Sequence, residues 1–231
     1  MLRVGLTGDL GSGKSTVARM FAERGAIVLS SDEMGRAMMQ PGQPVYAAIV
    51  KHFGREVIAG DGSGDGSLDR GALARLAFSD GRVEELNAIV HPAVIAEQAR
   101  QIKRLARKHR DAIVIVESAL LFTTKHGDSD QSDQSWHDRF DRIVLVTAPE
   151  EQKIARFVER AGAGRLLDPQ ERAALEADAR ARLAMQTANE AHAAECLVIR
   201  NDGDIEALQR KVDAVWSGLQ KLEIGKTDAV S

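Results

Sequence analysis

Residues 5–21 read GLTGDLGSGKSTVARMF, and this stretch decides the fold class. Its residues 8–15 satisfy the pattern G-x-x-x-x-G-K-[ST], whose glycines let backbone N–H groups turn around phosphate oxygens. In this pattern Lys14 bridges phosphates as a point charge, and Ser15 offers its hydroxyl to Mg²⁺. A helix that starts at the loop directs its positive end at the same anion. The stretch predicts a nucleotide site formed by Gly8, Gly11, Ser12, Gly13, Lys14, Ser15 and Thr16.

Five aliphatic runs, one of them leading into this loop, predict a parallel sheet. The runs are continuous and do not alternate, which is typical of strands that are covered on both faces. Helical patterns lie between them, over residues 14–25 and again after Pro149, a residue that suits the first turn of a helix. We therefore expect a doubly wound α/β fold with about five strands. The runs are residues 2–7, 26–31, 112–118, 142–148 and 196–201.

Two long segments interrupt this alternation. Residues 33–111 hold no clear strand pattern and are expected to form a mainly helical insertion. Residues 150–190 are a helical, arginine-rich stretch whose polar faces are expected to be exposed. Such a stretch is typical of a flap over an active site, and equally of a solvated helical pair without a catalytic role. From composition alone, both interpretations stay open.

The composition limits the class of protein. The 231-residue chain has a formal net charge of -3, which disfavours a general nucleic-acid-binding protein. Its single cysteine, Cys196, excludes an internal disulfide and suits a reducing cytosol. The first apolar run is too short for a signal peptide, and no stretch approaches the roughly 18 to 20 apolar residues of a membrane-spanning helix. We expect a cytoplasmic protein without a membrane or nucleic-acid partner; the sequence does not define its oligomeric state.

Two carboxylates follow predicted strands, at the edge where ligands of α/β sheets bind. Asp32 comes 18 positions after Lys14 and can accept a proton from a hydroxyl that attacks the terminal phosphate. Equally, Ser30 and Glu33 have the spacing of a helix capping box, which would make Asp32 an ordinary first-turn residue. Glu117 ends the third run, where it can hold Mg²⁺ directly or through water, or merely cap the next turn.

A GTP-dependent switch is an alternative of a different class. The guanine-binding pattern N-K-x-D is absent from the sequence. The pattern D-x-x-G occurs at residues 32–35, too early for a switch loop, and again at residues 61–64 in a turn-like segment. Phosphoryl transfer is therefore the better interpretation.

Several further stretches occur in a recognisable order. After the loop come SSDEMGRAMMQPG (30–42), DGSLDRGALARLAF (65–78) and LNAIVHPAV (86–94), and later RFVER, RLAMQ and VIRNDG. Over roughly residues 2–215 the sequence resembles the dephospho-coenzyme A kinases, which transfer the γ-phosphate of ATP to the 3′-hydroxyl of dephospho-coenzyme A. The resemblance implies ATP with Mg²⁺ and dephospho-coenzyme A as ligands, in the last step of coenzyme A synthesis.

The resemblance assigns roles on the acceptor side. It places the catalytic aspartate at Asp32, and so favours the catalytic interpretation of that residue over the capping one. It places a following substrate-binding arginine at Arg36. His91 and Pro92 fall on the family's His-Pro pair, which implies contact with the substrate. The same pair also fits a junction between helices, at which proline takes the first turn.

On the donor side, the resemblance places a lid at residues 150–190. Arg156 and Arg160 are four positions apart, hence on one helical face, and imply a clamp on the phosphates. Asn201 falls on a late signature after the last strand, where a loop that contacts adenine is expected. The alternative is that both arginines are ordinary solvent-exposed residues of a helix and do not contact phosphate.

Five positions depart from the family pattern. Asp9 stands where a second loop glycine is usual, and Ser30 stands where the family has an aspartate. After the third strand, Glu117 replaces an aspartate, Ala119 a proline and Thr123 a glutamate. Glu117 preserves the charge, whereas the carboxylate expected at position 123 is lost.

The implied architecture is a single kinase unit over residues 1–231 with three parts. Other small-molecule kinases, such as those acting on nucleoside monophosphates, and a nucleotide-binding module without chemistry are the alternatives. The parts are a core at about 1–32, 112–149 and 191–221, a substrate-binding insertion at about 33–111, and a lid at about 150–190.

Overall fold

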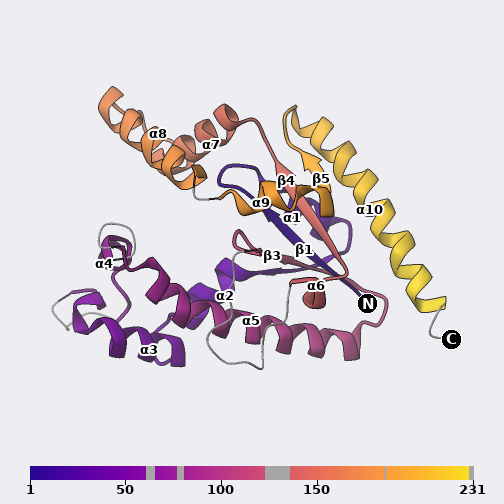
Figure 1. Ribbon diagram of the computed structural model, residues 1–231, viewed down its shortest axis with the longest axis horizontal. Coiled ribbons are helices and arrows are strands. Elements are labelled where there is room, and N and C mark those ends of the chain that lie inside the picture. Colours follow the sequence, from indigo (N-terminus) through magenta and orange to yellow (C-terminus); the bar gives the residue numbers. More distant parts are fainter. Residues whose placement is uncertain (61–65, 77–80, 123–135, 185, 229–231) are drawn as a thin grey trace. The chain divides into compact units, whose positions relative to one another are not determined.

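The computed structural model describes residues 1–60, 66–76, 81–122, 136–184 and 186–228 (Figure 1). The chain divides into two compact units, each described by itself below. Thr123 lies outside the described residues. The first unit comprises residues 1–29, 105–123 and 134–231, and the second comprises residues 30–104 and 124–133.

A five-stranded sheet has the order β2-β3-β1-β4-β5, and β1 pairs in parallel with both β3 and β4. β5 pairs in parallel with β4 at one edge of the sheet. The predicted α/β fold with about five strands is confirmed. The ends of the observed strands lie within one or two residues of the ends of the predicted runs. The strands are β1 (Leu2–Gly8), β2 (Ile27–Ser30), β3 (Ile113–Glu117), β4 (Arg142–Thr147) and β5 (Leu197–Arg200).

The central strands are buried on both faces, as their continuous apolar runs predict. Val114 and Val116 of β3 are fully buried, and so is Ile115 on the opposite face. The edge strand β5 differs, because Leu197 and Val198 are 37% and 45% exposed. Covering on both faces therefore holds for the middle of the sheet and not for this edge.

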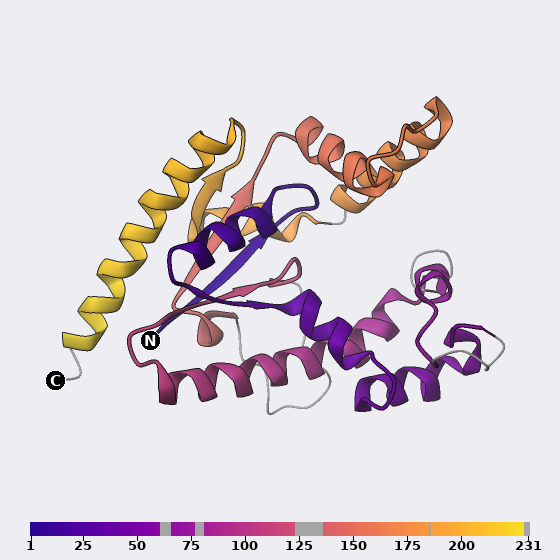
Figure 2. The same cartoon turned by 180° about the vertical axis from the view of Figure 1, so that it is seen from behind.

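Two helices cover one face of the sheet, as Figure 2 shows. α1 (Lys14–Glu23) presents Val17 and Phe21, and α10 (Ile205–Asp228) presents Val212 and Leu219, all fully buried in the same core. Truncation of a side chain such as Phe21 to alanine typically costs about 3–5 kcal/mol. The helix that follows the loop is therefore held firmly on the sheet. Short helices among the described residues of this unit include α6 (Trp136–Arg139), α9 (Ala188–Ala191) and η3 (Ala193–Glu195).

Strand register brings three functional segments to one edge of the sheet. Leu6 of β1 lies opposite Glu117 of β3, and Thr147 of β4 lies opposite Arg200 of β5. The loop after β1, the end of β3 and the turn after β5 therefore follow strands that end side by side. This is the edge at which open α/β sheets bind ligands.

α7 (Glu150–Gly162) and α8 (Pro169–Ala184) form a helical hairpin within the first unit, and they lie side by side in Figure 1. α7 ends where Ala163 takes a left-handed conformation with φ 50°. A small apolar core joins the two helices, and Leu10 of the phosphate loop belongs to it. Its members are Ile154, Phe157, Val158 and Ala179, with Leu10, Leu167, Leu175 and Leu183 packed against them.

The second unit is mainly helical, as the absence of strand patterns predicts. Its core contains Ile49, Phe53 and Val57, with Ile89 and Val90 packed against them. The three-part division into core, insertion and lid remains a prediction. The helices among its described residues include α2 (Ser31–Met38), α3 (Pro44–Phe53), η1 (Arg55–Val57), α4 (Arg70–Ala74) and α5 (Val83–Lys108), the last of which extends beyond the unit.

The interpretation of His91-Pro92 as a helix junction was wrong. Pro92 lies inside the continuous helix α5 and does not begin a helix. A proline there removes one backbone hydrogen bond, to the carbonyl of Ala88, and normally disfavours a helix. Ile89, Val90 and Ala93 pack against the core of the second unit on both sides of the proline, and this burial offsets the lost bond.

Candidate active site

The N-terminus of α1 is open to an anion. Gly13 occupies its N-cap with φ 93°, and no side chain of the described residues caps it. By contrast, the side chain of Ser30 caps α2 and accepts a hydrogen bond from the backbone N of Glu33. Uncapped first-turn N–H groups together with the helix dipole form an anion-binding site. The predicted phosphate loop therefore has the local structure that phosphate binding requires.

Lys14, Ser15 and Glu117 meet at one carboxylate oxygen. The Nζ of Lys14 lies 3.0 Å from Oε1 of Glu117, and the Oγ of Ser15 donates to the same oxygen at 2.9 Å. The side chains of Lys14 and Glu117 are only 13% and 11% exposed. Hydroxyl and carboxylate oxygens are the hard donors that Mg²⁺ prefers, so the donor set fits the predicted metal.

Two glycines of the loop leave space for atoms of neighbouring segments, where a side chain would overlap them. A Cβ at Gly11, whose φ is +70°, would overlap the backbone carbonyl of Lys153. A Cβ at Gly13 would overlap Nδ2 of Asn201. Sequence reasoning attributed these glycines to the approach of phosphates. The structure adds a second requirement, since α7 and the turn after β5 both pack directly on the loop.

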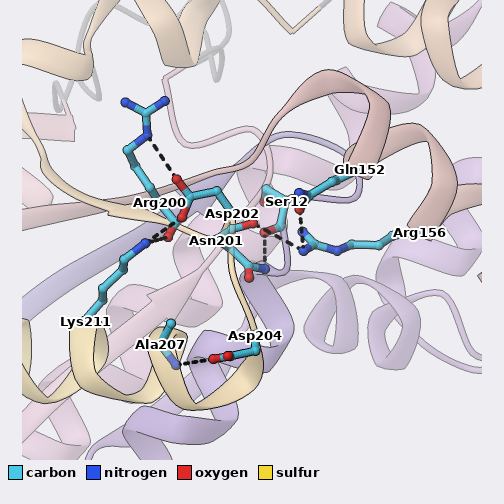
Figure 3. A network of polar contacts seen from close by, with 9 residues as sticks. All are labelled: Ser12, Gln152, Arg156, Arg200, Asn201, Asp202, Asp204, Ala207 and Lys211. Carbon is cyan, nitrogen blue, oxygen red and sulfur yellow. Dashed lines mark hydrogen bonds and ion pairs between the residues drawn. The ribbon is translucent and has the colours of Figure 1, made fainter.

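Asn201 and Arg156 both donate hydrogen bonds to the phosphate loop, and Figure 3 shows the bond from Asn201 to Ser12 and those from Arg156 to Asn201 and Gln152. The buried Nδ2 of Asn201 donates a 2.9 Å hydrogen bond to the carbonyl of Ser12. The guanidinium of Arg156 donates to the carbonyls of Gly11 at 3.4 Å and Asn201 at 3.2 Å, and also to Gln152 at 3.1 Å. The loop, the start of α7 and the turn after β5 are thus joined through two side chains.

The turn after β5 has a polar network of its own (Figure 3). Lys211 of α10 donates to the carbonyl of Arg200 at 2.7 Å and to Oδ1 of Asp202 at 2.6 Å. The hydrogen bond from Lys211 lowers the pKa of Asp202. Asp204 caps α10 by accepting a 2.7 Å hydrogen bond from the backbone N of Ala207. These contacts fix the turn that carries Asn201.

The two lid arginines have different surroundings. Arg156 is half-buried against the phosphate loop, whereas Arg160 is exposed one turn further along α7. Their common helical face follows from the spacing, but only Arg156 lies within hydrogen-bonding distance of the loop. Their predicted phosphate contacts remain predictions.

The predicted acceptor-side residues lie in the second unit. Asp32 and Arg36 are both exposed on α2, one turn apart. α2 is fixed to α5 by a 2.7 Å hydrogen bond from Gln98 to Ser31. His91 is half-buried on α5, and burial lowers its pKa, with Glu84 acting in the opposite direction. The capping interpretation of Ser30 is confirmed, and it leaves the carboxylate of Asp32 exposed to solvent.

Sequence reasoning missed three residues around the loop. Lys153 and Asn189 both bind the carboxylate of Asp9, at 2.8 Å each. Gln186 accepts a 2.8 Å hydrogen bond from the backbone N of Leu10. One signal was available, because Asp9 departs from the glycine that the resemblance has at this position. Nothing in the sequence identified its partners.

No helix among the described residues is long and apolar enough to span a membrane. A parallel α/β sheet, a phosphate loop after its first strand and a loop lysine bound to the carboxylate at the end of β3 are typical of phosphate-loop nucleotide-binding proteins.

The family follows from comparison with known sequences. The sequence model of the family "Dephospho-CoA kinase" matches residues 2–207. A dephospho-CoA kinase from Streptomyces avermitilis is 37% identical over 221 residues, covering 95% of this chain and 94% of the relative. The chain therefore belongs to the dephospho-CoA kinase family.

Solved structures share the fold of this chain. TT1252 from Thermus thermophilus matches with a TM-score of 0.68 and 30% identity, covering 94% of this chain and 97% of the other. A dephospho-CoA kinase from Campylobacter jejuni matches with a TM-score of 0.58 at 18% identity, covering 95% and 97%, and this likeness shows the fold.

Proposed function

We propose that this protein transfers the γ-phosphoryl group of ATP to the 3′-hydroxyl of dephospho-coenzyme A. The observation that carries the proposal is the convergence of Lys14, Ser15 and Glu117 beside the uncapped start of α1. Membership of the family, matched over residues 2–207, supports the acceptor. Phosphoryl transfer requires mainly positioning and neutralisation of charge, and this cluster supplies both.

On the donor side, the backbone N–H groups of residues 8–16 bind the phosphates of ATP. Lys14 binds the β- and γ-phosphates, where its charge offsets the charge of the transferring group. Ser15 and Glu117 hold Mg²⁺, which neutralises phosphate charge when it is bound. The 3.0 Å pair supports these roles, because it places the lysine Nζ beside the carboxylate at the end of β3.

On the acceptor side, Asp32 orients the 3′-hydroxyl and takes its proton as the oxygen attacks phosphorus. Its exposed position on a helix that is capped by Ser30 supports this role, since the carboxylate has no part in the cap. Arg36, one turn further, offers a charge to the anionic acceptor, and His91 offers a neutral ring nitrogen.

The hairpin α7–α8 acts as the lid in this proposal. Arg156 and Arg160 neutralise charge on the transferring group, and closure of the lid excludes water that would otherwise hydrolyse ATP. Asn201 supports the loop that receives the nucleotide, which accounts for its burial. The three-part division into core, insertion and lid, and a cytoplasmic location, complete the proposal.

The test is an assay of phosphoryl transfer from ATP with Mg²⁺ to dephospho-coenzyme A. AMP serves as the parallel acceptor, and Asp32→Asn is the key variant because it keeps the shape and removes the base. We expect coenzyme A from the native protein and a loss of kcat of about 10²–10⁴-fold in the variant. Binding of a non-hydrolysable ATP analogue should be retained by the variant.

Three outcomes separate the alternatives. Phosphorylation of AMP in place of dephospho-coenzyme A would assign the protein to the nucleoside monophosphate kinases. Nucleotide binding without transfer to either acceptor would indicate a binding module. Full activity of Asp32→Asn would refute the role of Asp32 while leaving the substrate assignment intact.

A further inference from the structure

The phosphate loop carries an acidic side chain that is nearly removed from solvent. Asp9 is 18% exposed and Lys153 of α7 is 15% exposed, and their charged atoms are 2.8 Å apart. The second carboxylate oxygen of Asp9 accepts a 2.8 Å hydrogen bond from Nδ2 of Asn189. Both oxygens of this carboxylate are therefore bound to residues that lie far from the loop in the sequence. We call Asp9, Lys153 and Asn189 the Asp9 junction.

Asn189 ties the junction to the sheet. It is 6% exposed, and its Oδ1 accepts a 3.2 Å hydrogen bond from the hydroxyl of Thr7, which is fully buried in β1. The amide of Asn189 thus has a fixed orientation, since its oxygen faces Thr7 and its nitrogen faces Asp9. A fixed amide in turn fixes the carboxylate that accepts from it.

The neighbouring loop residue binds the hairpin as well. Leu10 packs into the apolar core of α7 and α8, and its backbone N donates a 2.8 Å hydrogen bond to Gln186. The backbone carbonyl of Lys153 lies where a Cβ at Gly11 would otherwise be. Residues 9 to 11 therefore face the hairpin through charge, apolar contact and close backbone approach in succession.

Electrostatics gives this arrangement a function. A carboxylate within a loop that receives polyphosphate repels its ligand unless an adjacent cation balances it. Lys153 supplies that balance at 2.8 Å, and limited exposure weakens the screening of the pair by solvent. Lys153 also lies one turn before Arg156, which donates to the carbonyl of Gly11. The position of Lys153 therefore sets the position of the turn that bears Arg156.

We propose that Asp9 and Lys153 are positioning residues for the nucleotide: together they fix the first turn of α7 on the phosphate loop and keep the loop electrically neutral toward polyphosphate. For the transfer reaction, this inference rests on the function proposed above. Asn189 orients Asp9 within the pair. The lid is then anchored to the loop at its base, so binding of phosphate at the loop and the position of the hairpin are coupled.

The test is a double-mutant cycle read by binding of the ATP analogue AMPPNP with Mg²⁺, measured by calorimetry without any acceptor. Lys153→Met leaves the negative charge of Asp9 without a neighbouring cation. We expect the dissociation constant of this variant for AMPPNP to rise about tenfold or more. Asp9→Asn removes the charge while keeping the shape, and should raise the constant only about threefold. The double variant should return to within about threefold of Asp9→Asn, because the repulsion is gone.

Matched controls separate positioning from general stability. Glu150 of α7 and Arg180 of α8 form a different ion pair of the hairpin, at 3.3 Å, and their side chains are 63% and 58% exposed. Glu150→Gln should therefore change the dissociation constant less than twofold. Lys153→Arg should retain most of the binding, since it keeps the charge. Thermal unfolding of every variant shows whether it is folded at the assay temperature.

The outcomes are distinct. A double variant as weak as Lys153→Met would overturn the inference, because it would mean that Lys153 contacts phosphate directly. Tighter binding by Asp9→Asn than by the native protein would overturn it as well. Failure of the native protein to phosphorylate dephospho-coenzyme A would refute the proposed function only, since the binding cycle needs no acceptor.

Discussion

Lys14 and Glu117 form a nearly buried ion pair, with the lysine Nζ 3.0 Å from Oε1 of the carboxylate. The pair joins the phosphate loop to the end of β3, and it depends on the register that sets Leu6 opposite Glu117. Glu117 also accepts from the hydroxyl of Ser15. The carboxylate is therefore the counter-ion of the loop lysine. Removal of one partner would leave an uncompensated charge in a poorly solvated site.

Glu117→Gln should lower activity and weaken the response to Mg²⁺. The amide keeps the shape and can still accept hydrogen bonds, but it loses the charge that a divalent ion needs. We expect a loss of about 10- to 100-fold in kcat or in apparent affinity for Mg²⁺. Initial rates measured as a function of Mg²⁺ concentration check this, with the exposed Glu23→Gln as a charge-matched control. An unchanged Mg²⁺ dependence would argue that Glu117 serves only Lys14.

Gly11→Ala and Gly25→Ala should have different consequences although both glycines have positive φ, at +70° and +98°. Each substitution introduces backbone strain of about 1–2 kcal/mol. Only at Gly11 does the new Cβ meet another atom, the carbonyl of Lys153, whereas nothing lies within 4 Å at Gly25. We expect the KM for ATP to rise more than tenfold in Gly11→Ala and less than twofold in Gly25→Ala. Equal effects on KM, measured beside urea unfolding, would contradict a specific contact.

Cys196 should react slowly with thiol reagents. Burial, with the nearby charge of Glu195 as the second cause, raises its pKa to about 11. Its Sγ also donates to the carbonyl of His192 at 3.2 Å. At pH 8 little thiolate is present, so labelling should be at least about tenfold slower than for an unperturbed thiol, and it should accelerate as the pH rises toward 11. Labelling kinetics with iodoacetamide, before and after unfolding in urea, provide the measurement. A native rate equal to the unfolded rate would refute the shielding.

His91 should make the protein less stable in mild acid. Its pKa is lowered in the folded state by burial, so the unfolded chain binds the proton more readily. The neutral ring therefore makes its full contribution to the free energy of unfolding above the pKa of His91 in the unfolded chain, about 6.5. This contribution is lost as the pH falls below that value. Urea unfolding at pH 7.5 and 5.5 should show a smaller decrease in stability for His91→Gln than for the native protein. The exposed His109→Gln is the control, and an identical decrease in all three proteins would exclude His91 as a cause.

Local pattern was sufficient for much of the fold and part of the site. The apolar runs predicted all five strands. Central parallel strands are buried on both faces, so their residues are apolar at consecutive positions. The spacing of Ser30 and Glu33 predicted a cap that the structure confirms. The loop pattern located Lys14 and Ser15, and the order of strands brought Glu117 to them.

Contacts between distant segments could not be predicted in this way. Pro92 signals a helix boundary locally, but the packing of residues on both sides of it keeps α5 continuous. The spacing of Arg156 and Arg160 predicts a shared face, yet it does not tell which turn of the helix meets the loop. The partners of Asp9 come from α7 and α9, and no periodicity links such residues.

The hydrogen bond from Asn201 to Ser12 has a consequence for synthesis of the chain. The two residues are 189 positions apart, so at about 5–20 residues per second the phosphate loop leaves the ribosome roughly 10–40 s before the amide that supports it. The delay between the synthesis of Thr7 and that of its partner Asn189 is almost as long, because the two residues are 182 positions apart. A nascent chain that ends before these residues carries the complete loop sequence without the groups that hold it. Nucleotide binding is therefore expected to appear only after residue 201 has been synthesised and has left the ribosome.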